Sequence, residues 1–211
     1  MRDFRLIHLA DFPEASCLDA FARFADENER ASNARIANPS RRRNHARAHG
    51  GLRLALTEVL GRPVVAPFRQ SATGKPALDG GPWFSLSHVG ESSWLAISDA
   101  PIGLDVVEIT AADGPLDDGF VSAADRQALA SIGICSPGAD RVAWAIKEAC
   151  AKLADDVWRP PVDWRLVLRE RLTVLSAGQA EMIVELREMS GNKVAAVAVW
   201  KEYCGESAWL R

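Results

Sequence analysis

One stretch of the chain, residues 142–153, most constrains the fold. Its apolar side chains recur at the i, i+4, i+7, i+8 and i+11 spacing of one helical stripe, formed by Val142, Ile146, Ala149, Cys150 and Leu153. The spacing predicts an amphipathic helix with Glu148 and Lys152 one turn apart, off the stripe. Such a helix presents a carboxylate and an ammonium side by side. The alternative interpretation is a solvated ion pair worth about 0.3 kcal/mol to the helix.

Other segments predict a mixture of helices and antiparallel strands, that is, an α+β fold. Apolar periodicity and turn signals divide the chain into short elements. Helices are expected at 14–31, 52–60 and 122–130, strands at 4–10, 82–88, 93–98, 102–109, 164–168, 172–175, 182–187 and 194–200, and loops at 64–82 and 110–119. Each half runs helix then strands, which hints at a repeat.

Composition excludes several classes of protein. The chain has 211 residues, enough for one large or two small domains, with a net charge of −3 that argues against general nucleic-acid binding. No apolar run approaches the ~20 residues of a membrane span, and the N-terminus lacks signal-peptide character. The cysteines are scattered and form no close pair: Cys17, Cys135, Cys150 and Cys204. We therefore expect a cytoplasmic protein with free thiols.

A basic cluster follows Pro39 and contains Arg41, Arg42, Arg43, His45, Arg47, His49 and Arg53. Arginine suits phosphate through its planar fork of donors, so the cluster predicts a phosphate-binding surface. A solvated helix face is the open alternative.

Asp105 lies inside an apolar strand, where a carboxylate needs a partner, a hydrogen-bond network or a metal. Strand alternation places Asp105 and Val107 on one face, and Val106 and Glu108 on the other. Asp105 and Glu108 should therefore not share one ion. A local cap or salt bridge at Asp105 is the alternative.

Three motifs occur in a set order: Gly74-Lys75-Pro76 with Phe84-Ser85-Leu86-Ser87-His88, then Ile102-Gly103-Leu104-Asp105-Val106, and last Trp144-Ala145-Ile146-Lys147-Glu148-Ala149 followed by Lys152. Each alone is weak; a lone Gly-Lys-Pro is usually a turn. Their order and spacing, from about Arg41 to Lys152, closely resemble the 4′-phosphopantetheinyl transferase superfamily in its surfactin-type, two-lobe branch.

The resemblance implies transfer of 4′-phosphopantetheine from coenzyme A to a serine of an apo acyl, peptidyl or aryl carrier protein, with adenosine 3′,5′-bisphosphate as the other product. It implies Mg²⁺, with Mn²⁺ as a substitute, held by Asp105 and Glu148. Lys152 would neutralise the α-phosphate and Glu148 would accept the serine proton. Coenzyme A contacts are implied for Lys75, Ser87, His88, Arg47, His49 and Lys147, with Arg41 to Arg43 and Arg53 less clearly assigned.

The resemblance also implies two pseudo-twofold-related lobes, residues 1–101 and 102–211, each with an antiparallel sheet packed on a long helix. Coenzyme A would lie between them in a monomer that binds carrier proteins but neither nucleic acid nor membrane. One departure concerns Val107, where the branch carries a second acid. A non-catalytic coenzyme A-binding protein and a carrier-protein-docking module are the competing hypotheses.

Overall fold

The computed structural model describes residues 3–135, 138–178 and 180–204, so the outer ends of both expected lobes lie outside the described residues. The first half contains three helices, a short 3-10 turn and five strands. In chain order they are β1 (Phe4–His8), η1 (Leu9–Asp11), α1 (Glu14–Phe24), α2 (Glu27–Ala34), α3 (Pro39–Leu60), β2 (Arg69–Gln70), β3 (Pro76–Ala77), β4 (Trp83–Val89) and β5 (Ser92–Ser98).

The described residues of the second half form two helices, two 3-10 turns and five strands. In chain order they are β6 (Ile102–Glu108), α4 (Ala123–Ala130), α5 (Ala139–Ala154), η2 (Pro161–Asp163), β7 (Arg165–Leu168), β8 (Leu172–Leu175), β9 (Glu181–Met189), β10 (Lys193–Trp200) and η3 (Lys201–Tyr203). The α+β class predicted from the sequence is therefore confirmed. No helix in the described ranges is long and apolar enough to cross a membrane.

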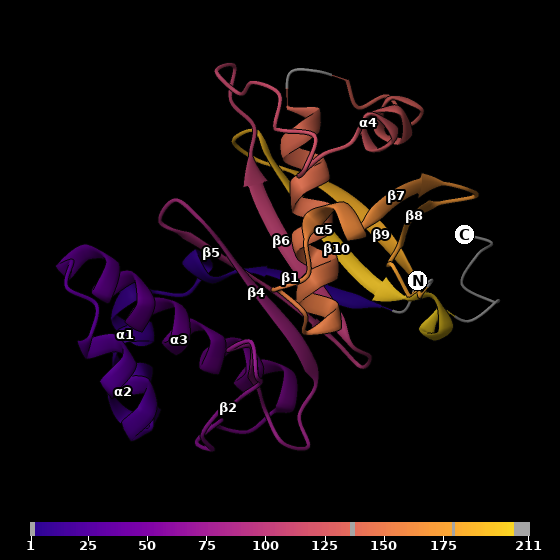
Figure 1. Cartoon of the computed structure of the whole chain (residues 1–211). Helices are drawn as coiled ribbons and strands as arrows, with labels where there is room; N and C mark the ends of the chain where they lie inside the picture. The colour runs from indigo at the N-terminus through magenta and orange to yellow at the C-terminus, as the bar shows by residue number, and fades with distance from the viewer. Residues whose placement is uncertain (1–2, 136–137, 179, 205–211) are drawn as a thin grey trace.

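The two main sheets share one pattern of connections. The first has the order β1-β5-β4 and the second the order β6-β10-β9-β8-β7, all antiparallel. In each, an opening strand is followed by helices and then by a hairpin whose last strand pairs with the opening strand. Figure 1 shows α1, α2 and α3 grouped on one side of the molecule and α5 lying against the second sheet. The order β1-β5-β4 thus recurs as β6-β10-β9, and β7 and β8 extend only the second sheet.

Two serine side chains join the sheets. The Ser85 hydroxyl accepts a hydrogen bond from the Leu104 N–H, and the Ser87 hydroxyl accepts one from the Val106 N–H, both at 3.0 Å. These side-chain hydrogen bonds take the place of backbone-to-backbone hydrogen bonds between β4 and β6 and hold the two strands side by side. The two buried hydroxyls therefore satisfy backbone donors at an edge of the second sheet.

Helix α5 has the buried stripe that the sequence predicts. All five stripe residues are at most 6% exposed, and they belong to a core cluster that includes Leu129, Trp164 and Val174. This apolar contact fixes the helix on the sheet and leaves Glu148 and Lys152 half-buried at its edge.

Three predicted elements differ from the structure. The expected helix 14–31 is two helices, because Asp26 accepts the Glu29 N–H and Glu29 in turn accepts the Asp26 N–H, a capping box that starts α2. The expected helix 52–60 is the end of the longer α3, which Asn38 caps and a left-handed Gly61 terminates. The expected loop 64–82 contains the small β2–β3 hairpin.

Candidate functional site

The site is built where α5 meets β6, and Gly103 allows the two elements to approach. A Cβ atom at position 103 would lie 1.9 Å from the Ala149 carbonyl oxygen, far inside any van der Waals contact. The helix backbone therefore packs directly on the strand at this point. Asp105 is two residues further along β6 and lies on the same face as Gly103.

Asp105 and Lys152 form an ion pair across this contact. The Lys152 ammonium donates to the Asp105 carboxylate at 2.7 Å and to the Leu104 carbonyl at 3.1 Å. The side chains are only 13% and 24% exposed. Ser87 donates a further hydrogen bond of 2.8 Å to the same Asp105 oxygen. Asp105 is therefore oriented from both halves of the chain.

Glu148 lies one turn before Lys152 and is half-buried, with no hydrogen bond or ion pair to another described residue. Burial raises its pKa above the ordinary value; the Lys152 ammonium opposes this increase and the Asp105 carboxylate adds to it. Glu148 is thus within electrostatic range of both side chains. The structure brings together the three residues that the resemblance implies for catalysis.

The two carboxylates fit a hard divalent cation. Asp105 and Glu148 supply oxygen donors, and Glu148 has no protein cation bonded to it among the described residues. No group of three or more His, Cys, Asp or Glu residues in the described ranges is arranged so that it could hold a metal ion. Mg²⁺ is commonly held by one or two carboxylates together with water and substrate phosphates, so two protein ligands suit this ion.

A pocket of about 620 Å³ lies between the start of α3 and the β4–β5 turn. Its lining is mainly polar and consists of Ile36, Ala37, Asn38, Arg41, Asn44, His45, His88, Gly90, Glu91 and Ser93. Arg41 is exposed and free of ion pairs among the described residues, so its guanidinium is available to an anion.

His88 is a lining residue of the pocket that also interacts electrostatically with the carboxylate site. Its ring is exposed and exchanges a hydrogen bond of 2.7 Å with Ser93. Desolvation by surrounding protein atoms lowers the pKa of His88, Lys152 and His49 lower it further, and Asp105 opposes them. His88 therefore lines the pocket and is within electrostatic range of the Asp105–Lys152 pair. Its exposed ring can contact a ligand that occupies both.

The histidines of α3 form a stack behind the pocket. The rings of His45 and His49 are 4.2 Å apart, and His49 also pairs with Glu29 at 3.0 Å. Burial lowers the pKa of His45 to about 4, with smaller contributions from His49 and His88 and an opposing one from Glu29. His45 is therefore neutral near pH 7.

The basic cluster predicted from the sequence does not act as one surface. Arg53 is buried, pairs with Glu29 and donates to the Ala66 carbonyl at 3.0 Å, so its guanidinium is not available to a phosphate. Arg43 pairs with Glu14 at 2.6 Å. The remaining members also have separate positions: Arg42 donates to the Ile36 carbonyl, and Arg47 lies within electrostatic range of Glu14 and Cys17. Of the residues proposed from this cluster, Arg41 and His45 line the pocket.

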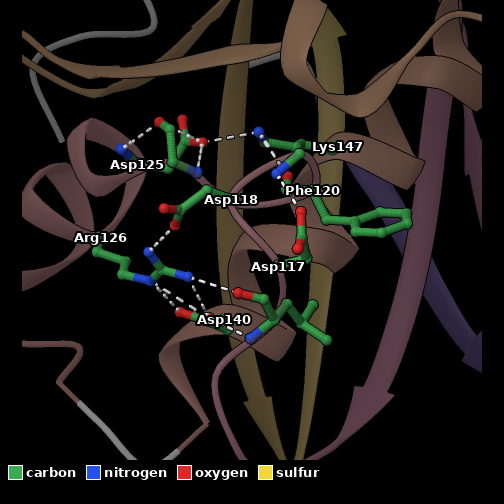
Figure 2. Close-up of polar contacts among 10 residues, drawn as sticks. Asp117, Asp118, Phe120, Asp125, Arg126, Asp140 and Lys147 are labelled. Carbon is green, nitrogen blue, oxygen red and sulfur yellow. Dashed lines mark hydrogen bonds and ion pairs between the residues drawn. The ribbon is translucent and has the colours of Figure 1, made fainter.

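Two further predicted coenzyme A contacts are occupied by the protein itself. Lys147 is 3% exposed and donates to Asp125 at 2.7 Å and to the Phe120 carbonyl at 2.9 Å (Figure 2). This placement contradicts its assignment as a cofactor contact, because a ligand cannot reach the ammonium. The Ser87 hydroxyl is likewise used by Asp105 and Val106 and is buried, so it is not available to a ligand.

Figure 2 also shows how the connector before α4 is fixed on α5. Arg126 donates to Asp140 at 2.9 Å, to Asp118 at 2.6 Å and to the Leu116 carbonyl at 2.8 Å. Asp125 also accepts the Leu166 N–H at 3.0 Å. Burial favours a higher pKa for Asp125, but hydrogen bonds from Lys147, Leu166 and Ser122 lower it overall. These contacts support α5, and apart from Lys147 the residues that make them lie outside the three motifs.

Lys75 lies at the tip of the β2–β3 hairpin, beside the C-terminal end of α5. Its ammonium donates to the Lys152 carbonyl at 2.9 Å and to the Ile102 carbonyl at 3.1 Å. Burial lowers the pKa of Lys75 to about 8; the Asp155 carboxylate opposes this shift and Lys152 contributes to it. The sequence motifs single out Lys75 as a coenzyme A contact, but they do not include Asp155.

No protein-family model matches the chain, and no curated protein sequence matches it. The arrangement is chemically suited to binding a pyrophosphate ester. Two carboxylates can hold a cation, Lys152 supplies a fixed positive charge, and a pocket with Arg41 and His88 adjoins them.

Proposed function

We propose that the chain transfers 4′-phosphopantetheine from coenzyme A to a serine of an apo carrier protein, in a Mg²⁺-dependent reaction that releases adenosine 3′,5′-bisphosphate. The observation that carries the proposal is the meeting of Asp105 from β6 with Lys152 and Glu148 from α5. Asp105 is 43 positions before Glu148 and 47 before Lys152, and the three residues come together near a pocket lined by Arg41 and His88.

The repeated strand order supports the two-lobe architecture that the motifs imply. In the proposed lobes, β1, α3 and the β4–β5 hairpin correspond to β6, α5 and the β9–β10 hairpin. Ser85 and Ser87 join the lobes at the β4–β6 contact. Coenzyme A then extends from the pocket at α3 toward Asp105.

Each residue of the site has a separate role in the transfer reaction. The serine hydroxyl of the carrier attacks the β-phosphorus, and the bond from this phosphorus to the bridging oxygen of the α-phosphate breaks. Asp105 and Glu148 would hold a Mg²⁺ ion, which would supply charge neutralisation at the pyrophosphate. Lys152 neutralises charge on the leaving group, and Glu148 accepts the serine proton. His88 and Arg41 contact coenzyme A phosphates at the pocket.

Val107 restricts the ligand set to two. Its side chain packs against the apolar cluster under α5, and Glu108 is exposed on the strand's other face. The acid that the surfactin-type branch carries at this position is therefore not replaced by Glu108. The same observation favours the competing hypothesis, a coenzyme A-binding protein that has lost turnover.

One assay separates these functions. The protein is incubated with coenzyme A, Mg²⁺ and a panel of apo carrier proteins, and the carriers are weighed by mass spectrometry. We expect a gain of one phosphopantetheine group that chelation of the metal prevents. Asp105→Ala and Glu148→Ala should each reduce transfer at least about 100-fold, and the matched control Glu108→Ala should not. Coenzyme A binding without transfer to any carrier would instead support the non-catalytic hypothesis.

A further inference from the structure

The tip of the β2–β3 hairpin, residues 71–75, is fastened to the end of α5 through Asp155. The Asp155 carboxylate accepts a hydrogen bond of 2.6 Å from the Ser71 hydroxyl and another from the Thr73 hydroxyl. The tip is itself ordered, since the Ser71 N–H donates to the Lys75 carbonyl and the Lys75 N–H to the Ser71 hydroxyl. This contact joins segments more than 80 residues apart.

The backbone at Asp155 indicates that its side chain is needed there. Asp155 ends α5 with φ 54° and ψ 38°, a left-handed conformation that glycine adopts most easily. A residue with a side chain is disfavoured at such a position unless its contacts compensate. The two hydroxyl donors on Asp155 supply that compensation.

The hairpin tip also contacts the two segments that carry the reacting groups. Lys75 donates to the carbonyl of Lys152 on α5 and to the carbonyl of Ile102 on β6. Lys152 reaches Asp105 by its side chain, and Asp105 is three residues after Ile102. The tip thus bridges the helix and the strand at the point where the ion pair forms.

We propose that Asp155 and Lys75 are positioning residues, which clamp the last turn of α5 to the start of β6 and so hold Lys152 against Asp105. This inference rests on the proposed transferase function. Two of the three ammonium protons of Lys75 are used by backbone carbonyls, so Lys75 acts through Lys152 rather than as a phosphate contact.

Substitutions at Asp155 isolate the clamp. Asp155→Gly keeps the left-handed backbone and deletes the acceptor, whereas Asp155→Asn keeps both the backbone and an acceptor oxygen. Asn192→Gly is the matched control, because Asn192 has the same φ of 54° in a turn remote from the hairpin tip. Thr73→Val removes one donor from the other side without changing the shape of the side chain.

We expect Asp155→Gly to lower kcat about tenfold or more with little change in the KM for coenzyme A, because a small misplacement of a reacting group is costly. Asp155→Asn and Asn192→Gly should stay near the wild-type rate. Thr73→Val should lower kcat, and combining it with Asp155→Gly should add little, since both remove the same contact. Lys75→Met should likewise lower kcat.

Three results would overturn the clamp while leaving the transferase function intact. These are full activity of Asp155→Gly, an equal loss in Asp155→Asn, and a Lys75→Met variant in which only the KM for coenzyme A rises. If Asp155→Gly does not fold, Thr73→Val decides by the same kcat criterion. A wild-type protein that modifies no carrier would overturn the function itself, and the positioning role with it.

Discussion

At the scale of single residues, Ser87 has a structural role, which it shares with Ser85, and a contact with Asp105, which Ser85 lacks. Ser85 and Ser87 each accept a β6 backbone N–H, but only Ser87 also donates to Asp105. Replacing either with alanine leaves a buried N–H without its partner, at a cost of about 1–3 kcal/mol in unfolding free energy. Ser87→Ala should in addition release one bond that orients Asp105.

The pair therefore forms its own control for catalysis. We expect similar losses of unfolding free energy in urea for Ser85→Ala and Ser87→Ala, but a markedly lower kcat only for Ser87→Ala. Equal kcat values in the two variants would show that the hydroxyl at 87 is structural.

His45 should make the folded state sensitive to mild acid. Its pKa is lowered from 6.5 to about 4, so the unfolded chain binds more protons between these values. The stability that neutral His45 contributes is complete above about pH 6.5 and is lost as the pH falls toward 4. Allowing for partial exposure of the ring, about 1–2 kcal/mol should be lost between pH 7 and pH 5.

Urea unfolding at these two pH values tests the prediction at His45. His45→Gln cannot titrate, so its unfolding free energy should fall less than that of the wild type by this amount. An identical pH dependence in both proteins would place the acid sensitivity elsewhere, for instance at His88, whose pKa is lowered too.

At the scale of elements, Gly103 sets the distance between α5 and β6. A methyl group there would meet the Ala149 carbonyl at 1.9 Å, and the Leu153 N atom at 2.7 Å, so the helix has to move. Gly103→Ala should cost about 1–3 kcal/mol of unfolding free energy through overpacking. It should also reduce transfer, because Lys152 moves away from Asp105.

Gly114→Ala is the control for this substitution, since a Cβ at 114 meets nothing within 4 Å. Thermal unfolding and the transfer rate are measured for both variants. A Gly103→Ala protein as stable and active as the wild type would mean that the helix and strand tolerate a wider separation than the contact implies.

The elements also show what a sequence can predict. Regular periodicity gave α5 and most strands of the main sheets to within about two residues, because one buried face imposes one period. The break at Asp26 was readable from the capping pair Asp26 and Glu29, a signal that the long charged segment obscured. The β2–β3 hairpin has strands of two residues, too short to show any alternation.

The candidate site was predictable only in part, for a related reason. Motif spacing places Asp105, Glu148 and Lys152, but it does not indicate which polar side chains are neutralised inside the protein. Lys147 can be buried because it forms an ion pair with Asp125 on another helix. Arg53 can be buried because it forms an ion pair with Glu29. Such pairings depend on tertiary packing and leave no local pattern.

At the scale of the whole molecule, several contacts between the halves predict that the chain unfolds as one unit. Ser85 and Ser87 accept hydrogen bonds from the β6 backbone, and Lys75 donates hydrogen bonds to both α5 and β6. Asp155 accepts a hydrogen bond from Ser71 at the hairpin tip. Loss of either half would leave these buried donors and acceptors unpaired. Opening one half alone should therefore cost nearly as much free energy as global unfolding.

Amide hydrogen exchange tests this cooperativity with a reporter in each half. Buried amides in the middle of α3, near Leu52 and Leu56, should exchange with the same opening free energy as those of α5 near Ile146 and Ala149. The double variant Ser85→Ala/Ser87→Ala should lower both values together if the halves are coupled through this seam. A decrease confined to one helix, or two separate transitions in the wild type, would mean that the halves fold independently and that the seam aligns Asp105 without stabilising the molecule.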